Sequence, residues 1–343
     1  MRNPQLKISN ITIQPGERIT VALPTPEIYT CAPIYIPIHI IHGKKAGPTL
    51  LICGAIHGDE INGVAITQRL LKLRLLNMIR GTLIVIPTMN IYGMMTMSRN
   101  LPDRRDLEGS FPGSNTGSFA SRLANLLTEE IFQHITHCID LHTGEPHISK
   151  FPQIKTSTNH PEATQLAYYF KAPVILNTQS SQGLLWLLNK EPNKIPTIIY
   201  ETGEALRLDL RGINMGVRGI VRVMKNIDML SSSLKGKRIP SSILIESETW
   251  VRASSSGLCE VFHNVGTFVK KGMKLARIFD PFGTEQKEEI FSPVDGIVIA
   301  RNQLPILNEG EPILQIAEIR KVERFHLPKP ASDCKSRSKH KSW

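Results

Sequence analysis

The sequence predicts an α/β fold, with a mostly parallel or mixed central sheet, helices on both faces of that sheet and a small C-terminal β domain. Residues 49–55 (TLLICGA) and 82–87 (TLIVIP) are short continuous apolar runs, typical of strands that are buried on both faces. Between them, residues 61–76 repeat apolar side chains at helical spacing, with basic side chains interspersed. Strands that alternate with helices in this way form a sheet covered by helices.

The same alternation continues along the first 230 residues. The first 45 residues read as short strands, and a long irregular loop over residues 90–117 follows the second buried strand. Active residues in such sheets gather just past the carboxyl ends of strands, so polar residues at those ends are the candidates for function. The further expected elements are an amphipathic helix over residues 118–137, strands over 138–141, 174–177 and 197–200, and a helix over 211–229.

A change of composition after Ser231 divides the chain into four parts. Residues 1–230 are expected to form the α/β domain, including the N-terminal strands, and residues 231–239 read as a linker rich in Ser, Lys and Gly. Residues 240–320 are punctuated by Gly and Pro at short intervals with almost no helical periodicity, which predicts a small β domain. Residues 321–343 form a basic tail that we expect to be disordered.

The net charge of +11 raises nucleic acid as a partner. Much of the excess is local, because it lies in the tail after Lys329 and in the basic run of residues 235–238. No RNA-binding or helix-turn-helix pattern accompanies these residues, so we interpret the tail as solvated and do not expect a nucleic-acid partner. A nucleic-acid binder is kept as a third hypothesis, which predicts binding that weakens steeply with salt.

Cysteine usage and hydropathy bear on the compartment. Every apolar run is shorter than the roughly 20 residues that span a bilayer, and residues 1–15 lack the apolar core of a signal peptide. We therefore expect a cytoplasmic protein without a membrane partner, and the sequence indicates no oligomeric state. Five scattered cysteines with no CxxC pair argue against a disulfide framework and fit a reducing compartment: Cys31, Cys53, Cys138, Cys259 and Cys334.

Two strand ends carry residues that can bind a metal ion. His57 and Glu60 lie three residues apart in the turn between the first buried strand and its helix, and His142 ends the strand at 138–141. Imidazole and carboxylate groups are the ligands that zinc takes in catalytic sites, where one position stays open for water. Asp140 lies on the same face of its strand as His142 and can orient a ligand or an arginine. An H-x-x-E pair alone arises often by chance, and two strand ends, each with a glycine turn, leave a zinc site and a chance pattern as equal alternatives.

Several separated motifs together resemble the succinylglutamate desuccinylase/aspartoacylase family, a branch of the zinc carboxypeptidase-like hydrolases. Their order and wide spacing agree with that family, and the resemblance covers about residues 30 to 320, including the region of the β domain around Ser292 to Val298. The matching segments are Gly54 to Glu60 (GAIHGDE), Arg99 to Leu107 (RNLPDRRDL), Phe111 to Gly113 (FPG), Asp140 to Gly144 (DLHTG) and Tyr200 to Gly203 (YETG).

The resemblance implies one zinc ion per chain, held by His57, Glu60 and His142. It also implies that Glu201 is the general base, which takes a proton from zinc-activated water and later protonates the leaving amine. Glu204 lies three residues further on, and we prefer Glu201 because it ends a buried strand. Arg99 matches the family arginine that polarises the scissile carbonyl and stabilises its oxyanion.

The sequence departs from the family pattern D-L-N-R-x-F-P-G, because Glu108 and Gly109 stand where the family has Asn and Arg. That pair normally grips the carboxylate of the substrate, so its loss removes donors and adds a negative charge at a substrate-binding position. Either the enzyme acts on a different, neutral or cationic acyl-amine, or hydrolysis has decayed and the fold has another role. Arg104 or Arg105 can replace the missing arginine, which mutation of each would test.

The leading hypothesis is a zinc-dependent amidohydrolase or deacylase that cleaves a small N-acyl amino acid or a peptide-like amide with zinc-activated water. The alternative is a metal-binding pseudoenzyme or interaction module on the same fold, which would use the β domain and the basic tail. Mutation of Glu201 separates them, because only the enzyme depends on that carboxylate.

Overall fold

The computed structural model describes residues 1–343 except 30–32, 180–182, 191–193, 232–240, 284–286 and 320–343. The expected linker falls, from residue 232 on, outside the described residues, and so does the whole of the expected basic tail. Within the described part of the chain, no helix is long and apolar enough to cross a membrane. Cys53, Cys138 and Cys259 are buried with free thiols, whereas the other two cysteines lie in the segments left out.

The fold is built on one mixed sheet with 13 strands, which confirms the predicted α/β class. Its centre is parallel, because β5 pairs with β6 and β7, and β7 pairs with β10, all in the same direction. Antiparallel strands extend it on both sides. The main path runs through β12 (Glu248–Arg252), β19 (Pro312–Glu318), β17 (Gly296–Asn302), β8 (Ile148–Thr156), β10 (Thr197–Glu204), β7 (His137–Gly144), β5 (Thr49–Gly54), β6 (Thr82–Ile86), β4 (Tyr35–His42) and β3 (Arg18–Pro24).

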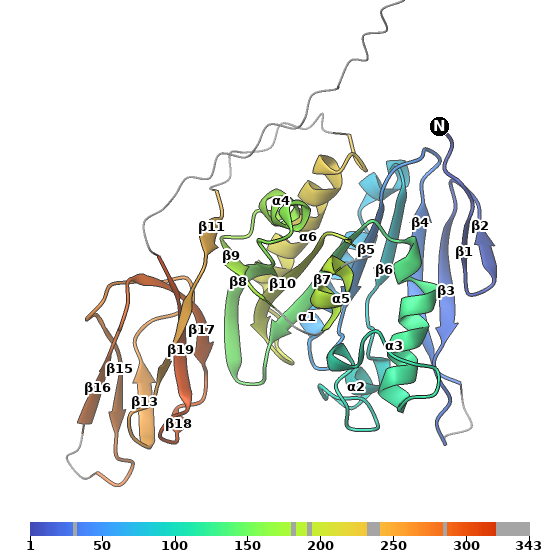
Figure 1. The fold of residues 1–343 in the computed structure, drawn as a ribbon. Helices are drawn as coiled ribbons and strands as arrows, with labels where there is room; N and C mark the ends of the chain where they lie inside the picture. Colours follow the sequence, from blue (N-terminus) through green and yellow to red (C-terminus); the bar gives the residue numbers. More distant parts are fainter. Residues whose placement is uncertain (30–32, 180–182, 191–193, 232–240, 284–286, 320–343) are drawn as a thin grey trace, which may run out of the picture.

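Helices cover both faces of the central strands, as Figure 1 shows. Alternate residues of one strand point to opposite faces, so Leu51 and Cys53 of β5 join one core and Leu50 and Ile52 join the other. The first core includes α3 (Phe119–Glu130) and α5 (Gly183–Asn189), and the second includes α1 (Ile61–Leu71), α4 (Pro161–Phe170) and α6 (Leu210–Asn226).

The C-terminal strands are joined to the central sheet. β17 pairs with β8 through Ala300 and Lys150, so β17, β19 and β12 continue the central sheet beyond β10. A separate four-stranded sheet packs with them around a core that includes Leu275, Ile278 and Leu314. Its strands are β13 (Gly257–Val261), β15 (Lys274–Phe279), β16 (Lys287–Phe291) and β18 (Ile306–Leu307).

The remaining elements are short. β1 and β2 form a hairpin, β9 and β11 pair with each other beside β8, and β14 pairs with β17. Three one-turn helices and α2 complete the fold. Their bounds are β1 (Leu6–Ile8), β2 (Ile11–Ile13), β9 (Val174–Asn177), β11 (Ile243–Ile245), β14 (Phe268–Val269), α2 (Ile91–Met95), η1 (Arg74–Met78), η2 (Glu108–Ser110) and η3 (Phe132–His134).

A candidate metal centre at the carboxyl edge of the sheet

The turn after β5 places His57 and Glu60 side by side. The backbone N–H of Glu60 donates to the carbonyl of His57 at 3.1 Å, which closes the turn and brings both side chains to the same place. Gly58 is required in this turn, because a Cβ there would lie 1.9 Å from the backbone carbon of Gly93. The N-terminal end of α1 follows at once, at Ile61, so the turn is anchored between a buried strand and a helix.

The carboxylate of Glu60 lies between two imidazole rings. Its Oε1 is 2.7 Å from Nδ1 of His57, and its Oε2 is 3.1 Å from Nδ1 of His142. The backbone N–H of Thr143 also donates to Oε2, at 3.0 Å. All three predicted zinc ligands are therefore together and buried, with the two Nδ1 atoms facing one carboxylate.

Asp140 fixes the orientation of His142. The Nε2 atom of His142 is 2.9 Å from Oδ2 of Asp140, a carboxylate that is fully buried two residues earlier in β7. A carboxylate that accepts from one imidazole nitrogen leaves the other nitrogen as the acceptor that a metal ion needs. Asp140 thus occupies the orienting position that the sequence suggests for it.

The loop that precedes α3 supplies the opposite wall of the site. The Nε2 atom of His57 faces this loop and lies 3.3 Å from Asp106 and 3.4 Å from Glu108. Arg99 binds Oδ2 of Asp106 through two guanidinium nitrogens, at 2.8 and 3.2 Å, and approaches Oε1 of Glu60 to 3.9 Å. The predicted oxyanion-stabilising arginine is therefore beside the predicted metal ligands, with its side chain 40% exposed.

Glu108 has a second possible role that sequence reasoning did not foresee. One ligand atom from each of His57, Glu108 and His142 lies within 4.8 Å of the others, so these three residues could also hold a metal ion. From the sequence, Glu108 is predicted only to be a changed substrate-binding residue. Its position in the family motif was visible, but its approach to the histidines depends on the path of the loop.

The charge balance of this cluster favours a bound cation. Four carboxylates (Glu60, Asp106, Glu108 and Asp140) surround two imidazole rings, with the guanidinium of Arg99 beside them. Burial opposes protonation of His57, but Asp106, Glu108 and Glu60 outweigh it and raise the pKa of His57 to about 10. Burial also opposes protonation of His142, yet Asp140 and Glu60 raise its pKa well above the usual value.

These shifts mean that without a metal ion the imidazoles take up protons to balance the carboxylates. A divalent cation held by His57, Glu60 and His142 would supply the same positive charge. The donor set of imidazole nitrogens and carboxylate oxygens, with buried and oriented ligands, therefore fits zinc.

Glu201 lies next to the metal ligands on the neighbouring strand. It is paired in register with His142 across the β10–β7 ladder, and its side chain is buried. Gln153 donates to its Oε2 at 2.6 Å, and the ammonium of Lys155 lies 3.0 Å from the same oxygen. Burial opposes ionisation of Glu201, but Lys155 and Lys150 outweigh this and lower its pKa to about 2. Glu204 instead pairs with Arg207, at 3.1 Å.

Arg104 and Arg105 lie at the surface of the loop. Both are exposed; Arg104 has a left-handed backbone conformation, with φ of 62°, and Arg105 approaches Asp103 to 3.9 Å. Neither has a described contact with the histidines or with Glu201. Their replacement of the missing family arginine stays a prediction.

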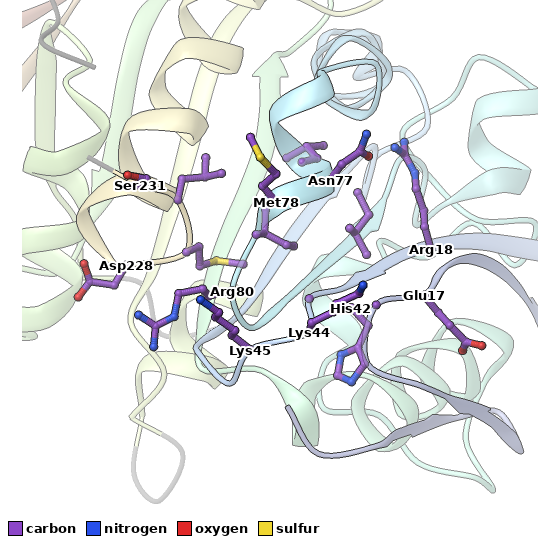
Figure 2. A pocket seen from close by; sticks show the side chains of 17 residues that line it. Glu17, Arg18, His42, Lys44, Lys45, Asn77, Met78, Arg80, Asp228 and Ser231 are labelled. Carbon is purple, nitrogen blue, oxygen red and sulfur yellow. The ribbon is translucent and has the colours of Figure 1, made fainter. Parts of the chain in front are cut away.

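A cavity of about 740 Å³ lies at the other end of the central strands, near the amino end of β6 (Figure 2). It is lined by both basic and acidic side chains near the start of β6 and the end of α6. The side chains labelled in Figure 2 include Arg18, Lys44, Lys45, Arg80 and Asp228. None of the residues of the candidate metal centre lines this cavity.

Comparisons with known proteins agree with the geometry. The sequence profile of the succinylglutamate desuccinylase/aspartoacylase catalytic domain matches residues 46–227, which contain every residue of the candidate centre. The chain is 25% identical over 297 residues to N-alpha-acetyl-L-2,4-diaminobutyric acid deacetylase from Halomonas elongata, covering 83% of this chain and 86% of the relative.

Two solved structures share the fold over nearly the whole chain. The product-bound ectoine utilization protein EutE (DoeB) from Ruegeria pomeroyi has a TM-score of 0.79 and 22% identity, with 93% of this chain and 100% of that chain covered. A succinylglutamate desuccinylase/aspartoacylase from Rhodobacter sphaeroides has a TM-score of 0.77 and 23% identity, with coverage of 89% and 96%. The match to the catalytic domain spans more than half of the chain, and the protein therefore belongs to the succinylglutamate desuccinylase/aspartoacylase family.

Proposed function

We propose that this protein is a zinc-dependent deacylase that hydrolyses the amide bond of a small N-acyl amino acid. The observation that carries the proposal is the carboxylate of Glu60 between the Nδ1 atoms of His57 and His142, with Glu201 on the adjoining strand. The relative from Halomonas elongata, which is named as a deacetylase of an N-acetylated amino acid, supports this class of substrate.

Zinc, when bound by His57, Glu60 and His142, would supply a Lewis acid that lowers the pKa of water to about 7. The carboxylate of Glu201, a residue in register with His142, would accept a proton from the attacking water and later deliver it to the leaving amine. Gln153 holds the carboxylate of Glu201 in place by donating to Oε2. Because this contact needs only one carboxylate oxygen, the other remains available for the proton.

Arg99 would stabilise the negative charge that develops on the carbonyl oxygen of the substrate. Its guanidinium is already oriented by Asp106 through two nitrogens, and a donor held in advance need not reorganise during the reaction. The guanidinium is partly exposed, so a substrate can approach it from solvent.

A direct assay tests the proposed function. Protein loaded with zinc is incubated with a panel of N-acetyl-, N-succinyl- and N-formyl-L-amino acids, including N-alpha-acetyl-L-2,4-diaminobutyrate, and the release of free amine is measured. We expect release from at least one member, which should stop when zinc is removed by a chelator and return when zinc is added. Absence of release across N-acetyl, N-succinyl and N-formyl amino acids would overturn the proposal.

A metal-binding pseudoenzyme is the second candidate, and the position of Glu108 favours it. A catalytic zinc site keeps a position open for water, and a fourth protein ligand, the carboxylate of Glu108, can fill that position. In that case, the wild type binds zinc without hydrolysis, and Glu108→Ala opens the site. Hydrolysis that appears only in Glu108→Ala would identify this alternative.

Zinc binding should strengthen as the pH rises. The neighbouring carboxylates raise the pKa of His57 to about 10, and they raise the pKa of His142 in the same direction. Zinc binds only deprotonated rings, so its binding should release protons at pH 7. The apparent Kd should therefore fall as the pH rises toward about 10. Calorimetry in buffers with different ionisation enthalpies would count the protons, and a value near zero would contradict this account.

A further inference from the structure

The base proposed above has a cationic partner that the motifs do not contain. Lys155 lies two residues after Gln153 in β8, so both side chains point to the same face of the sheet, and its Nζ is 3.0 Å from Oε2 of Glu201. The side chain of Lys155 is 31% exposed, compared with 9% for Glu201. The side chain of Lys155 is therefore more accessible than the carboxylate that it contacts.

This ion pair holds Glu201 in a state that is poor for catalysis. A general base works best when its pKa lies near the working pH. A carboxylate paired with an ammonium group is a weaker proton acceptor, because protonation would break the ion pair. The pKa of Glu201, lowered to about 2 by Lys155 and Lys150, is consistent with that effect. A group that draws Lys155 away would make Glu201 a better proton acceptor.

The other cations near the site already have partners. Arg99 binds Asp106 through two nitrogens. Lys150 donates to Gln315 at 3.1 Å and lies 5.4 Å from the ring centre of Trp250. Lys155, in contrast, is bound to the residue that must change its partners during the reaction.

The strand register places Lys155 within reach of a small substrate. Glu201 is aligned with His142 on one side and with Gln153 on the other, so these three residues lie side by side across three strands. Neighbouring strands are about 4.8 Å apart, which puts β8 roughly 10 Å from β7. A long lysine side chain on β8 can therefore contact one end of an acyl amino acid whose amide lies at the metal centre.

We propose that Lys155 is a specificity-determining residue that binds the carboxylate of the N-acyl amino acid and, in doing so, leaves Glu201. This rests on the proposed function, because it assigns one end of the substrate of that site. Lys155 would take the place of the lost Asn-Arg pair from strand β8, whereas Glu108 and Gly109 belong to η2. The exchange replaces one carboxylate by another on the same ammonium group, so no proton, electron or covalent bond is transferred. Gln153 continues to hold Glu201 throughout.

Equilibrium binding tests this without relying on turnover. Two ligands, N-acetyl-L-2,4-diaminobutyrate and its α-carboxamide, are titrated by calorimetry into zinc-loaded Glu201→Gln protein, with and without Lys155→Met. The Glu201→Gln protein should bind the carboxylate ligand about 10- to 100-fold more tightly than the carboxamide, as expected for a charge-assisted hydrogen bond. Lys155→Met should abolish this preference by weakening only the carboxylate ligand, and Lys155→Arg should restore part of it. Glu201→Gln alone should bind the carboxylate more tightly than the wild type, since its amide competes less for Lys155.

Lys150→Met is the matched control, because it removes a lysine of the same strand that is already held by Gln315. It should keep the preference for the carboxylate. Zinc content and circular dichroism establish that each variant is folded. If Lys155→Met does not fold, Lys155→Gln takes its place in the experiment. Three outcomes would overturn the proposal. The preference for the carboxylate ligand could survive in Lys155→Met, or it could be absent from the Glu201→Gln protein itself. It could also disappear in Arg104→Ala or Arg105→Ala instead. Amine release by the wild type is measured separately, so a failure of the proposed function is distinguished from a failure of this inference.

Discussion

Alanine at His57 or His142 is expected to remove the zinc ion from the purified protein. The wild type should hold about one zinc per chain after zinc is supplied and the excess is dialysed away. Each imidazole provides an Nδ1 atom that faces Glu60, so deletion of either leaves two protein ligands instead of three. Even the loss of an orienting partner typically costs 10- to 100-fold in metal affinity, and loss of a ligand should cost more. Elemental analysis by mass spectrometry measures the content directly, and hydrolysis should fall to background in both variants.

His39→Ala is the control for this experiment. His39 lies in β4, on the far side of β6 from β5, and contacts Thr20 at 2.9 Å, away from the candidate centre. Zinc content should be unchanged in that variant. Retention of zinc in both the His57 and His142 variants would place the metal elsewhere, and a wild type that stays metal-free would leave a repurposed fold. A Glu108→Ala variant that also loses zinc would show that the carboxylate of Glu108 binds the metal.

The parts of the fold that sequence predicts well are those with a single, simple pattern. β5 and β6 are continuous apolar runs because they are buried on both faces, and α1 shows clear helical spacing. The expected helix over 61–76 ends at Leu71 and continues as the short helix η1, and the one over 118–137 ends at Glu130 before η3. Apolar spacing persists through such short helices, so periodicity alone overestimates the length of the helix.

β8 was missed because its sequence, ISKFPQIKT, has neither an apolar run nor a regular alternation. Pro152 in its middle cannot donate to a ladder and argues against a strand. The structure resolves this by a shift of register: β10 pairs with Gln153 on one side of Pro152 and with Lys150 on the other. The partner strand also changes there, from β17 near Lys150 to β9 from Gln153 onward. A strand that joins two parts of the sheet has mixed surroundings and hence a mixed sequence.

The same contrast applies to the candidate site. His57 and Glu60 follow β5, and His142 and Glu201 lie near the carboxyl ends of β7 and β10, so the strand-end rule together with the family motifs predicts this set from the sequence. Gln153 and Lys155 belong to the antiparallel strand β8, which has no motif and no strand-end signal. Their contacts with Glu201 depend on the pairing of β8 with β10, a long-range feature that local sequence does not encode. The contact of Glu108 with His57 depends on a loop path for the same reason.

The second large effect is expected from Glu201→Gln. This variant should keep about one zinc per chain, because Glu201 is not among the proposed ligands, yet lose hydrolysis by about 10²- to 10⁴-fold, the usual contribution of a general base. The amide has the shape of the carboxylate and can still accept from Gln153, so the loss would reflect the missing proton acceptor and not a collapsed site. Steady-state kcat and zinc content are measured on the same preparation.

Glu204→Gln is the matched comparison, because Glu204 is an equally buried carboxylate in the same strand that pairs with Arg207 instead of facing Lys155. Its kcat should stay within a few-fold of the wild type. If the two variants lost activity equally, the loss would come from a disturbed strand β10, and the assignment of Glu201 as base would be wrong. If neither variant altered the behaviour of the zinc-loaded protein, the metal-binding pseudoenzyme would be the better account. An isolated loss in Glu201→Gln requires a proton acceptor at that carboxylate, which an interaction module does not need.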